Sequence, residues 1–333
     1  MSELYNQEIK EQFLNEFYSD SEPTQRIVWF VFKRFAKFEN AVNRDIYTFT
    51  REEIREFLES TRPFNLSMAK RDGTYLFNYI SWSIENGLRK GNINPLLGVT
   101  DEFFESTLDK NKKILFTMEE FEELVEQLPN AQDQVLLLLI WHGIIGEELK
   151  EIVGLRYENI DWNNNKVTIR NRLDNITKEH VDVEFTFNNR MMHFLERAHT
   201  STNYYPLKSG SEKSKQILPS DYILKRIRKN TSDEDTPVSM NTLYTRINAI
   251  KNYLELEYLT TNSIKQSGML HMAYDLIANK KKYPGLTTQL YQEIGKKYNY
   301  AIIKSGDSYI YNSGFMARFI NEENLKKLYD LEL

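Results

Sequence analysis

One stretch of this 333-residue chain limits its fold more than any other: residues 131–144 read AQDQVLLLLIWHGI. The run 135–141 is apolar nearly all the way round, so a helix formed from it has no face to offer to water. The run is also far shorter than the ~20 apolar residues that a membrane-spanning helix needs. The stretch is therefore predicted to form a central helix that other elements cover on every side, which requires a sizeable domain around it.

After this helix, the spacing of the apolar residues changes from a helical to an alternating pattern. Residues 166–173 (KVTIRNRL) and 180–187 (HVDVEFTF) alternate and are rich in β-branched residues, with turn residues before and between them, which predicts an antiparallel hairpin. Helical patterns return over residues 188–198, 221–229, 240–254, 262–278, 286–297 and 322–331. Thr117 and Glu120 have the spacing of a capping box at the start of the first helix. Residues 117–333 are thus predicted to form a mainly α domain with a small antiparallel β-sheet.

The N-terminal third is predicted to be a separate helical bundle. Three segments carry apolar residues at helical spacing: 27–38, 51–60 and 66–88. Thr50 is placed to cap the second of these helices. The sequence RKGNINPLLGV ends the third, because its glycine and proline do not continue a helix. Residues 1–98 are predicted to form this bundle, and residues 99–116, acidic and then basic, to form a linker.

The net charge of −5 hides an uneven distribution. Residues 117–161 contain only Lys150 and Arg156 against 11 acidic residues, whereas residues 208–304 contain 16 basic and 9 acidic ones. Contacts with phosphates need a local positive surface and not a basic protein as a whole. Binding of nucleic acid through one face of the protein therefore stays open.

The composition argues against several other classes of function. With no cysteine, neither disulfides nor thiolate metal sites are available. The five histidines form no metal-binding spacing with nearby carboxylates, and there is no glycine-rich phosphate loop, so no metal or cofactor is predicted. The start of the chain has no secretory signal and no apolar run is long enough to span a membrane, so a cytoplasmic location is expected.

Two motifs resemble those of the tyrosine recombinases, also called phage integrases. In that family a buried helix is followed by a turn of the form T-G-L-R-I-S-E-L and then by W-x-D-I-D before the sheet. Here residues 145–152 (IGEELKEI) lie over that turn without a gap, and GLRYENID continues to residue 161. NINPLLGV at residues 92–99 is similar to the N-P-L-x-x-V that closes the family's first domain. The resemblance implies a tyrosine-recombinase-like architecture of two domains, a helical core-binding domain and a mixed catalytic-like domain. Both domains are expected to bind the same DNA duplex.

The resemblance also locates the positions that carry catalysis in the family, where paired arginines bind the scissile phosphate and a tyrosine attacks phosphorus. In register, the first arginine falls on Glu148, the family's histidine on Asn262 and the second arginine on Lys265. Lys296 lies where a later histidine or tryptophan stands in the family, and Ser305 lies at the tyrosine position, with Tyr309 and Tyr311 near it but displaced. A carboxylate ~4 Å from another negative charge is repelled by ~4 kcal/mol at an effective dielectric of about 20, whereas a guanidinium is attracted. The site is therefore predicted to be catalytically inactive.

Basic and polar side chains of both domains are the candidates for holding DNA. The predicted contacts are Lys70, Arg71, Arg89 and Lys90 in the first domain, and Arg172, Lys225, Arg226, Arg228, Lys229, Asn241, Tyr244, Arg246 and Lys265 in the second. The second set includes a helix predicted at LKRIRKN (224–230) and polar groups able to read base edges. For each group the alternative interpretation is an ordinary solvated or amphipathic helix face.

These features predict a sequence-specific double-stranded DNA-binding protein, and specifically a phage or prophage transcriptional repressor on an inactive recombinase scaffold, associated with the nucleoid. Two alternatives stay open: an active recombinase that uses Tyr309 or Tyr311, and an accessory architectural partner of an integrase. The apolar residues of the C-terminal helix in FMARFINEENLKKLYDLEL are interpreted either as packing on their own domain or as a surface for self-association.

Overall fold

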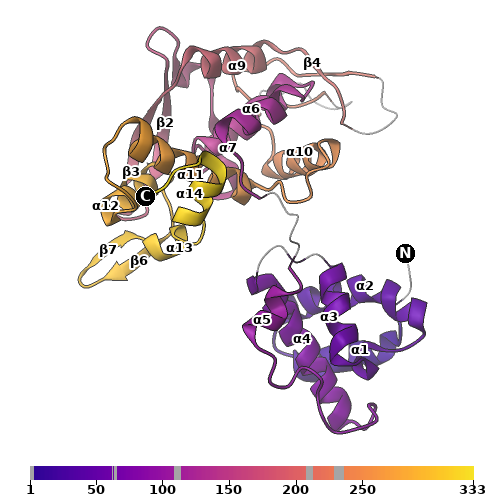
Figure 1. The fold of residues 1–333 in the computed structure, drawn as a ribbon. Helices are drawn as coiled ribbons and strands as arrows, with labels where there is room; N and C mark the ends of the chain where they lie inside the picture. The colour runs from indigo at the N-terminus through magenta and orange to yellow at the C-terminus, as the bar shows by residue number, and fades with distance from the viewer. Residues whose placement is uncertain (1–3, 62, 64–65, 109–113, 208–212, 229–235) are drawn as a thin grey trace. The chain divides into compact units, whose positions relative to one another are not determined.

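The computed structural model describes residues 4–61, 63, 66–108, 114–207, 213–228 and 236–333. The chain divides into two compact units, Met1–Lys112 and Lys113–Leu333 (Figure 1). The first is helical, and the second combines helices with small antiparallel sheets. The predicted fold class, mainly α with a small antiparallel β-sheet, is thus confirmed. Among the described residues, no helix is both long enough and apolar enough to cross a membrane.

The first unit is a bundle of helices with an aromatic core. Its helices are α1 (Gln7–Phe17), α2 (Glu22–Val42), α3 (Arg51–Ser60), α4 (Leu66–Glu85) and α5 (Asp101–Glu105), with the 3-10 turn η1 (Ile46–Thr48) between α2 and α3. Thr50 and Glu53 form the capping box that starts α3. Phe13 packs against Phe32 and Tyr79, and all three rings are fully buried. Caps set where the helices begin, and the buried rings supply the apolar area that holds the bundle together.

A cluster of buried charges lies inside this aromatic core. Lys10 donates to Glu39 at 2.9 Å and to Asp45 at 3.1 Å, and all three side chains are almost completely buried. The hydroxyl of Tyr79 also donates to Asp45, at 3.2 Å. One ammonium group therefore serves two carboxylates away from water. Burial, together with the charge of Asp45, raises the pKa of Glu39 to about 7 in spite of Lys10.

The segment predicted as a linker, residues 99–116, belongs in part to the units on either side. Helix α5 lies within it, and the ring of Phe104 is buried against Gly73, where an added Cβ would come within 2.3 Å of that ring. Phe116 is buried in the core of the second unit, and its N–H donates to the hydroxyl of Ser267 at 3.1 Å. The first unit therefore extends beyond the predicted end at residue 98, because Phe104 packs on α4.

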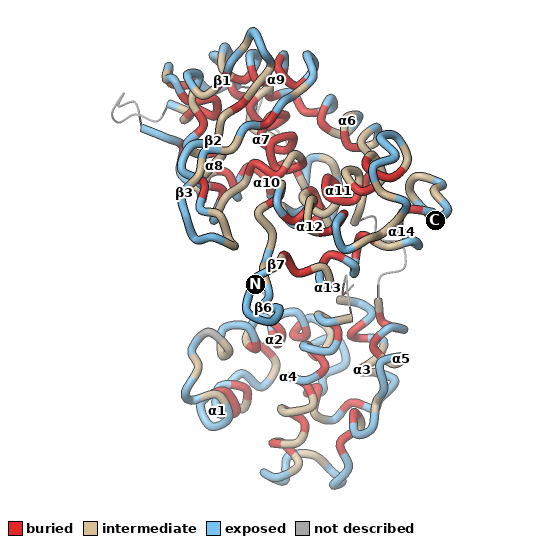
Figure 2. The backbone as a smooth tube through the Cα atoms, turned by 90° about the vertical axis from the view of Figure 1, so that its left-hand side faces the viewer, coloured by how far each residue is buried: buried red, intermediate tan, exposed pale blue. Residues whose placement is uncertain are grey.

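Helix α7 (Ala131–Trp141) has the central place that its sequence predicts. Every residue from Gln132 to Trp141 is buried (Figure 2). The helices packed around it are α6 (Met118–Glu126), α9 (Asn189–Thr200), α10 (Met240–Tyr253) and α11 (Thr261–Tyr274). Helix α11 approaches so closely that it needs Gly268, since a Cβ there would lie 2.0 Å from the carbonyl oxygen of Trp141.

The main sheet has three antiparallel strands. In order across the sheet they are β1 (Ile160–Asp161), β2 (Lys166–Leu173) and β3 (His180–Thr186). Ile169 pairs with Val183, but the register shifts between Ile169 and Arg172. This β-bulge changes the alternation of β2: Val167 and Ile169 are buried, and so is Arg172, which regular alternation would have turned to the other face.

Shorter elements complete the second unit. They are η2 (Glu147–Leu149), α8 (Lys150–Gly154), η3 (Tyr157–Asn159), β4 (Asn203–Tyr204), β5 (Lys215–Gln216), the π-turn η4 (Asp275–Asn279), α12 (Thr288–Lys297), β6 (Ile302–Ser305), β7 (Ser308–Tyr311), α13 (Ser313–Met316) and α14 (Glu322–Tyr329). The β6–β7 hairpin is absent from the predicted elements. Helix α14 packs on α11 of its own unit: Leu325 is fully buried, and Tyr329 stacks on Tyr274 with ring centres 4.3 Å apart.

The helix predicted over residues 221–229 does not form in the part that is described. That part is irregular, with bends at residues 221, 223 and 224, and isolated β-bridges join Tyr222 to Arg156 and Ile227 to Ile217. Residues 222–225 are buried one after another, which differs from the pattern of a helix with one face in solvent. Lys229, predicted to contact DNA, lies outside the described residues.

Candidate functional site

The turn between α7 and α8 carries the motif that resembles the recombinases. It begins at Gly146, whose φ of +65° favours glycine and where an added Cβ would lie 2.8 Å from Cγ of Glu151. Glu148 and Leu149 follow with φ of +53° and +65°, in a left-handed region that costs non-glycine residues ~1–2 kcal/mol each. Leu149 is buried and anchors the turn, while Glu148 is exposed. The side chain at the family's first arginine position is thus a carboxylate in solvent.

Behind the turn, Glu151 and Arg172 form a buried ion pair. Nε of Arg172 donates to Oε1 of Glu151 at 2.7 Å, and Nη2 donates to Oε2 at 2.5 Å. Oε2 also accepts from the backbone N–H of Ile145 at 3.0 Å. The guanidinium donates further to the carbonyl oxygens of Gly143 at 3.0 Å and Lys297 at 3.1 Å. It therefore ties the turn to β2 and to the end of α12.

Arg172 is thus part of the fold, and its prediction as a DNA contact loses support. Its side chain is 4% exposed, and that of Glu151 is 9% exposed. The bulge in β2 explains this burial, because regular alternation would have turned Arg172 away from the core. A phosphate can bind this guanidinium only by displacing Glu151, which would leave a buried carboxylate without its partner.

The other positions of the family's catalytic set do not gather around one cavity. Asn262 is exposed in the first turn of α11, and Ser305 is exposed at the end of β6. Lys265 is half-buried with its ammonium 5.2 Å from the ring centre of Tyr300, and burial lowers its pKa. Lys296 is exposed in the last turn of α12 and lines a cavity that none of the other four positions lines.

The two displaced tyrosines differ in exposure. Tyr309, on β7, is 51% exposed. Tyr311 is 3% exposed, and its backbone exchanges two hydrogen bonds of 2.9 Å with the side chain of Gln292. Burial raises the pKa of the Tyr311 hydroxyl to about 12. A buried phenol that keeps its proton is a poor nucleophile, so of the two it is Tyr309 that stays accessible to a DNA strand.

Lys225 and Arg246, both predicted to contact DNA, lie in the core. Arg246 is 4% exposed and donates to Oε1 of Gln132 at 3.2 Å and to the carbonyl oxygen of Lys225 at 3.0 Å. Its guanidinium lies 4.8 Å from the ring centre of Tyr204. The ammonium of Lys225 donates to the carbonyl oxygen of His199. Both predictions lose support for one physical reason: each cation finds its acceptors inside the unit.

Other predicted contacts of the second unit do reach the surface. Asn241 and Tyr244 are exposed on α10, and Arg228 is exposed in the segment before it. Arg226 is half-buried and donates to the hydroxyl of Thr236, shortly before α10 begins. We call Arg226, Arg228, Asn241 and Tyr244 the α10 surface.

In the first unit, cations from α2 and α4 meet at one buried carboxylate. Nη2 of Arg34 donates to Oδ2 of Asp72 at 2.6 Å, and Nε and Nη2 of Arg71 donate to Oδ1 at 3.0 and 2.9 Å. Lys70 is exposed and pairs with Asp101 at 2.7 Å. With two exposed lysines of α2, these cations form what we call the α2–α4 surface: Lys33, Arg34, Lys37, Lys70 and Arg71. The residues from α2 are not among the predicted contacts.

Arg89 and Lys90, predicted as a further pair of contacts, differ from each other. Arg89 is half-buried and donates to the carbonyl oxygens of Tyr47 and Phe49, the latter at 3.0 Å. It therefore holds the η1 turn in place, and its prediction as a phosphate contact has lost support. Lys90 is exposed, so it stays available for the predicted contact.

Comparisons with known proteins match both units. Residues 4–85 match the family model described as MrpR, N-terminal core-binding domain, and residues 115–330 match MrpR, C-terminal catalytic domain. The chain is also 28% identical over 338 residues to the SPbeta prophage-derived uncharacterized protein YopR of Bacillus subtilis (strain 168). That alignment covers 99% of this chain and 98% of YopR.

Solved structures of recombinases are similar at lower identity. The crystal structure of XerA recombinase is 11% identical, with a TM-score of 0.40 and 97% of each chain covered. A lambda integrase (75–356) dimer bound to a COC' core site is 10% identical, with a TM-score of 0.44 and 95% of each chain covered. Since the two MrpR models together match most of the chain, the protein belongs to the MrpR family, with a recombinase-like core-binding domain and a catalytic-type domain.

Proposed function

We propose that the protein binds double-stranded DNA at specific sequences, does not cut it, and represses transcription in a phage or prophage. The observation that carries the proposal is the arrangement at the α7–α8 turn. Glu148 is exposed at the first arginine position, while the guanidinium behind it, that of Arg172, is bound by Glu151. The scaffold thus presents a negative charge where strand cleavage needs a positive one.

The chemistry of strand cleavage gives this reversal its weight. Negative charge builds up on the phosphoryl oxygens in the transition state, and removing one donor aimed at such charge slows a reaction by ~10²–10³-fold. A carboxylate at Glu148 goes further, because it repels that charge. Asn262, at the position of the family's histidine, has no ionisable proton to give to a leaving oxygen. These departures support binding without reaction.

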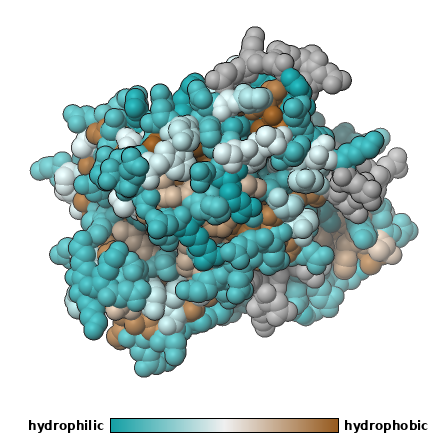
Figure 3. Space-filling model, turned by 90° about the horizontal axis from the view of Figure 1, so that it is seen from above, coloured by the Kyte–Doolittle hydropathy of each residue, from teal (hydrophilic) through white to brown (hydrophobic). Residues whose placement is uncertain are grey.

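The two surfaces defined above support the binding half of the proposal. The α2–α4 surface presents five cations, and the α10 surface combines Arg226 and Arg228, from the segment before α10, with Asn241 and Tyr244 on that helix. Contacts of cations with phosphates supply affinity, while side chains that reach base edges supply sequence readout. The face of the molecule in Figure 3 is largely hydrophilic, with small separate apolar patches, so it offers no large apolar surface to a partner.

Repression is the simplest output of a protein that holds DNA without cutting it, because an occupied site is closed to other proteins. YopR is described as SPbeta prophage-derived, which supports a phage or prophage context for this protein. DNA binding also implies association with the nucleoid. Self-association through α14 has less support, because Leu325 and Tyr329 already pack on α11.

Selection of bound sites from a random duplex library, followed by a reporter assay, tests the proposal. We expect one enriched motif, and reduced transcription when that motif lies across a promoter. Asn241→Ala should relax the motif at one base position by ~1–3 kcal/mol, whereas Asn252→Ala, exposed at the other end of α10, should leave it unchanged. Enrichment without any effect on transcription would favour an architectural partner of an integrase, and no enrichment would contradict sequence specificity.

A further inference from the structure

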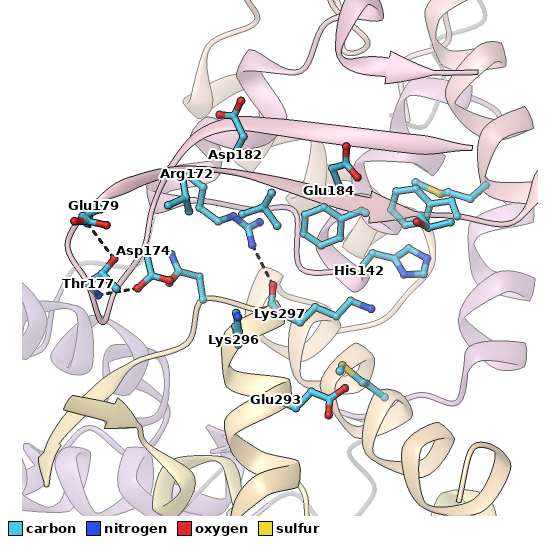
Figure 4. A pocket seen from close by; sticks show the side chains of 18 of the residues that line it. His142, Arg172, Asp174, Thr177, Glu179, Asp182, Glu184, Glu293, Lys296 and Lys297 are labelled. Carbon is cyan, nitrogen blue, oxygen red and sulfur yellow. Dashed lines mark hydrogen bonds between the residues drawn. The ribbon is translucent and has the colours of Figure 1, made fainter. Parts of the chain in front are cut away.

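The second unit contains a cavity of about 890 Å³ between β3 and the helices α11 and α12 (Figure 4). Much of its lining is apolar, namely Val181, Val183, Phe185, Phe187, Met191 and Met272. Sites for small molecules have volumes of ~300–1,000 Å³ and are mainly apolar with a few polar groups. No residue of the α2–α4 surface or the α10 surface lines this cavity, and Lys296 is the one position of the aligned catalytic set that does.

Several carboxylates at the rim of the cavity are already satisfied within the chain. Glu184 pairs with Lys166 at 2.9 Å, and Glu293 pairs with Lys282 at 2.7 Å. Asp174 accepts from two backbone N–H groups of the β2–β3 turn, both at 2.8 Å. These groups therefore do not serve as counter-ions for a cation inside the cavity.

Lys297 and His142 are polar groups of the interior. In Figure 4 the side chain of Lys297 runs along the cavity towards the ring of His142. Within the described part of the chain, no carboxylate lies within 4.0 Å of the Lys297 ammonium, which lies 5.9 Å from the ring centre of Tyr298. Burial lowers the pKa of Lys297, although the charge of Asp275 opposes that shift. Burial also lowers the pKa of His142 to about 3, so its imidazole is neutral at physiological pH and has one N–H to donate.

A half-buried ammonium group that contacts no carboxylate loses hydration without gaining an ion pair. An anion bound beside it would compensate its charge. The backbone of Lys297 is held in place at the cavity, because its carbonyl oxygen accepts a hydrogen bond from Arg172 at 3.1 Å. A DNA phosphodiester does not suit the place, since its sugars and charges would replace water along an apolar wall. An anion with an apolar body suits both parts of the cavity.

We propose that this cavity binds a small amphipathic carboxylate, with the carboxyl group between Lys297 and His142 and the apolar body along the inner side of β3. The same chemistry is offered by a free organic acid and by the carboxyl terminus of a short apolar peptide. Binding of either ligand does not require DNA, so this proposal can be tested independently of the function proposed above.

Calorimetry on the full chain tests the chemistry of the ligand with octanoate, octylamine and octan-1-ol as probes. We expect octanoate to bind at least about ten-fold more tightly than octan-1-ol, and octylamine not to bind. N-acetyl-Leu-Leu and its amide distinguish the peptide source: tighter binding of the free acid assigns the site to a peptide terminus, and binding of octanoate alone assigns it to a free acid. Equal affinities for octanoate and octan-1-ol, or no binding of any acid, would overturn the proposal.

Variants test the position of the anion. Lys297→Met should weaken octanoate binding by at least about ten-fold, and Lys304→Met, an exposed lysine on β6 that does not line the cavity, should leave it unchanged. If Lys297→Met does not fold, protection from an acetylating reagent gives the answer in the unaltered protein. Octanoate should protect Lys297 and not Lys304, and equal labelling of Lys297 with and without octanoate would contradict the assignment.

Discussion

Arg172 and Arg71 each hold a carboxylate with two nitrogen atoms, but the two pairs lie in opposite environments. The side chain of Arg172 is 4% exposed, and its partner Glu151 is 9% exposed. The side chain of Arg71 is 46% exposed, although its partner Asp72 is only 2% exposed. A guanidinium has five N–H donors, so what distinguishes the two arginines is where their remaining donors point.

Around Arg172 the remaining donors reach carbonyl oxygens of Gly143 and Lys297. Around Arg71 they face solvent at the α2–α4 surface, where a phosphate can approach. The comparison separates cations that hold the fold from cations that are free for DNA. The α7–α8 turn differs from that of the recombinases in the same terms. Its nearby arginine, Arg172, holds the fold, and the exposed residue at the family's first arginine position is Glu148.

The largest expected effect comes from breaking the inner pair. Arg172→Met should destabilise the second unit by ~3–5 kcal/mol, because Glu151 stays buried without its cation. Adding Glu151→Leu should recover much of that loss. Hydrogen exchange of the α7 amides in urea measures the change. Arg170→Ala, an exposed arginine on the same strand, is the matched control with an expected change within ~0.5 kcal/mol, and equal effects of the two variants would contradict the role of Arg172.

The buried charges of the first unit should give the next largest effect, and one that depends on pH. Because the pKa of Glu39 is raised from 4.5 to about 7, the folded state keeps a proton that the unfolded state releases. The contribution of Glu39 is fully present below pH ~4.5 and is lost as the pH rises towards ~7, a change on the order of 3 kcal/mol.

Glu39→Gln should remove this slope, since glutamine does not titrate next to Lys10, Asp45 and Tyr79. The measurement is the difference in unfolding free energy between wild type and variant at pH ~4.5 and ~7.5, from hydrogen exchange of amides in α2 and α4. A difference that is independent of pH, or that grows in favour of the wild type as the pH rises, would contradict the assigned shift.

Removing the outer cations should affect DNA binding and leave the fold nearly unchanged. Arg34→Ala and Arg71→Ala should each lower the slope of log affinity against log salt by about one. Each should change stability by less than ~1 kcal/mol, because Asp72 keeps the other arginine. Binding of the selected site at several salt concentrations gives the slope, with Arg55→Ala on α3 as control. Unchanged slopes would remove the α2–α4 surface from the interface.

The smallest expected effect is that of restoring a cation at the turn. Glu148→Arg should tighten DNA binding by no more than a few-fold, because the position is exposed and screened by salt. It should not create strand cleavage while Asn262 and Ser305 remain. A titration of the selected duplex measures the affinity, and a weaker complex would show that Glu148 makes a favourable contact of its own.

The elements of the fold that depend on residues close together in the sequence can be predicted from it. The all-apolar run 135–141 predicts a central helix, and α7 is one; the alternation in 166–173 and 180–187 predicts the β2–β3 hairpin, which also forms. The helix predicted over residues 221–229 does not form in its described part: lysine and arginine favour a helix locally, whereas bridges to Arg156 and Ile217 hold Tyr222 and Ile227 in another form.

The candidate site depends on contacts between distant residues, and less of it is predictable. The resemblance places Glu148 on its turn, but no local pattern reveals that a one-residue bulge turns Arg172 towards Glu151. The cavity brings His142 of the α7 end together with Lys297 of the α12 end, and each is an ordinary residue in its own stretch of sequence. Periodicity indicates which face of an element is buried, and it does not indicate which cation finds an acceptor there.

The most direct test of binding without cleavage is a covalent trap on the selected DNA site. A suicide duplex, nicked so that a cleaved strand end is lost, is incubated with the wild type, Glu148→Arg and Tyr309→Phe and then denatured. Our account predicts that all three proteins form specific complexes before denaturation and that none leaves a protein–DNA adduct after it. An adduct formed by the wild type and abolished by Tyr309→Phe would contradict the account and identify an active recombinase.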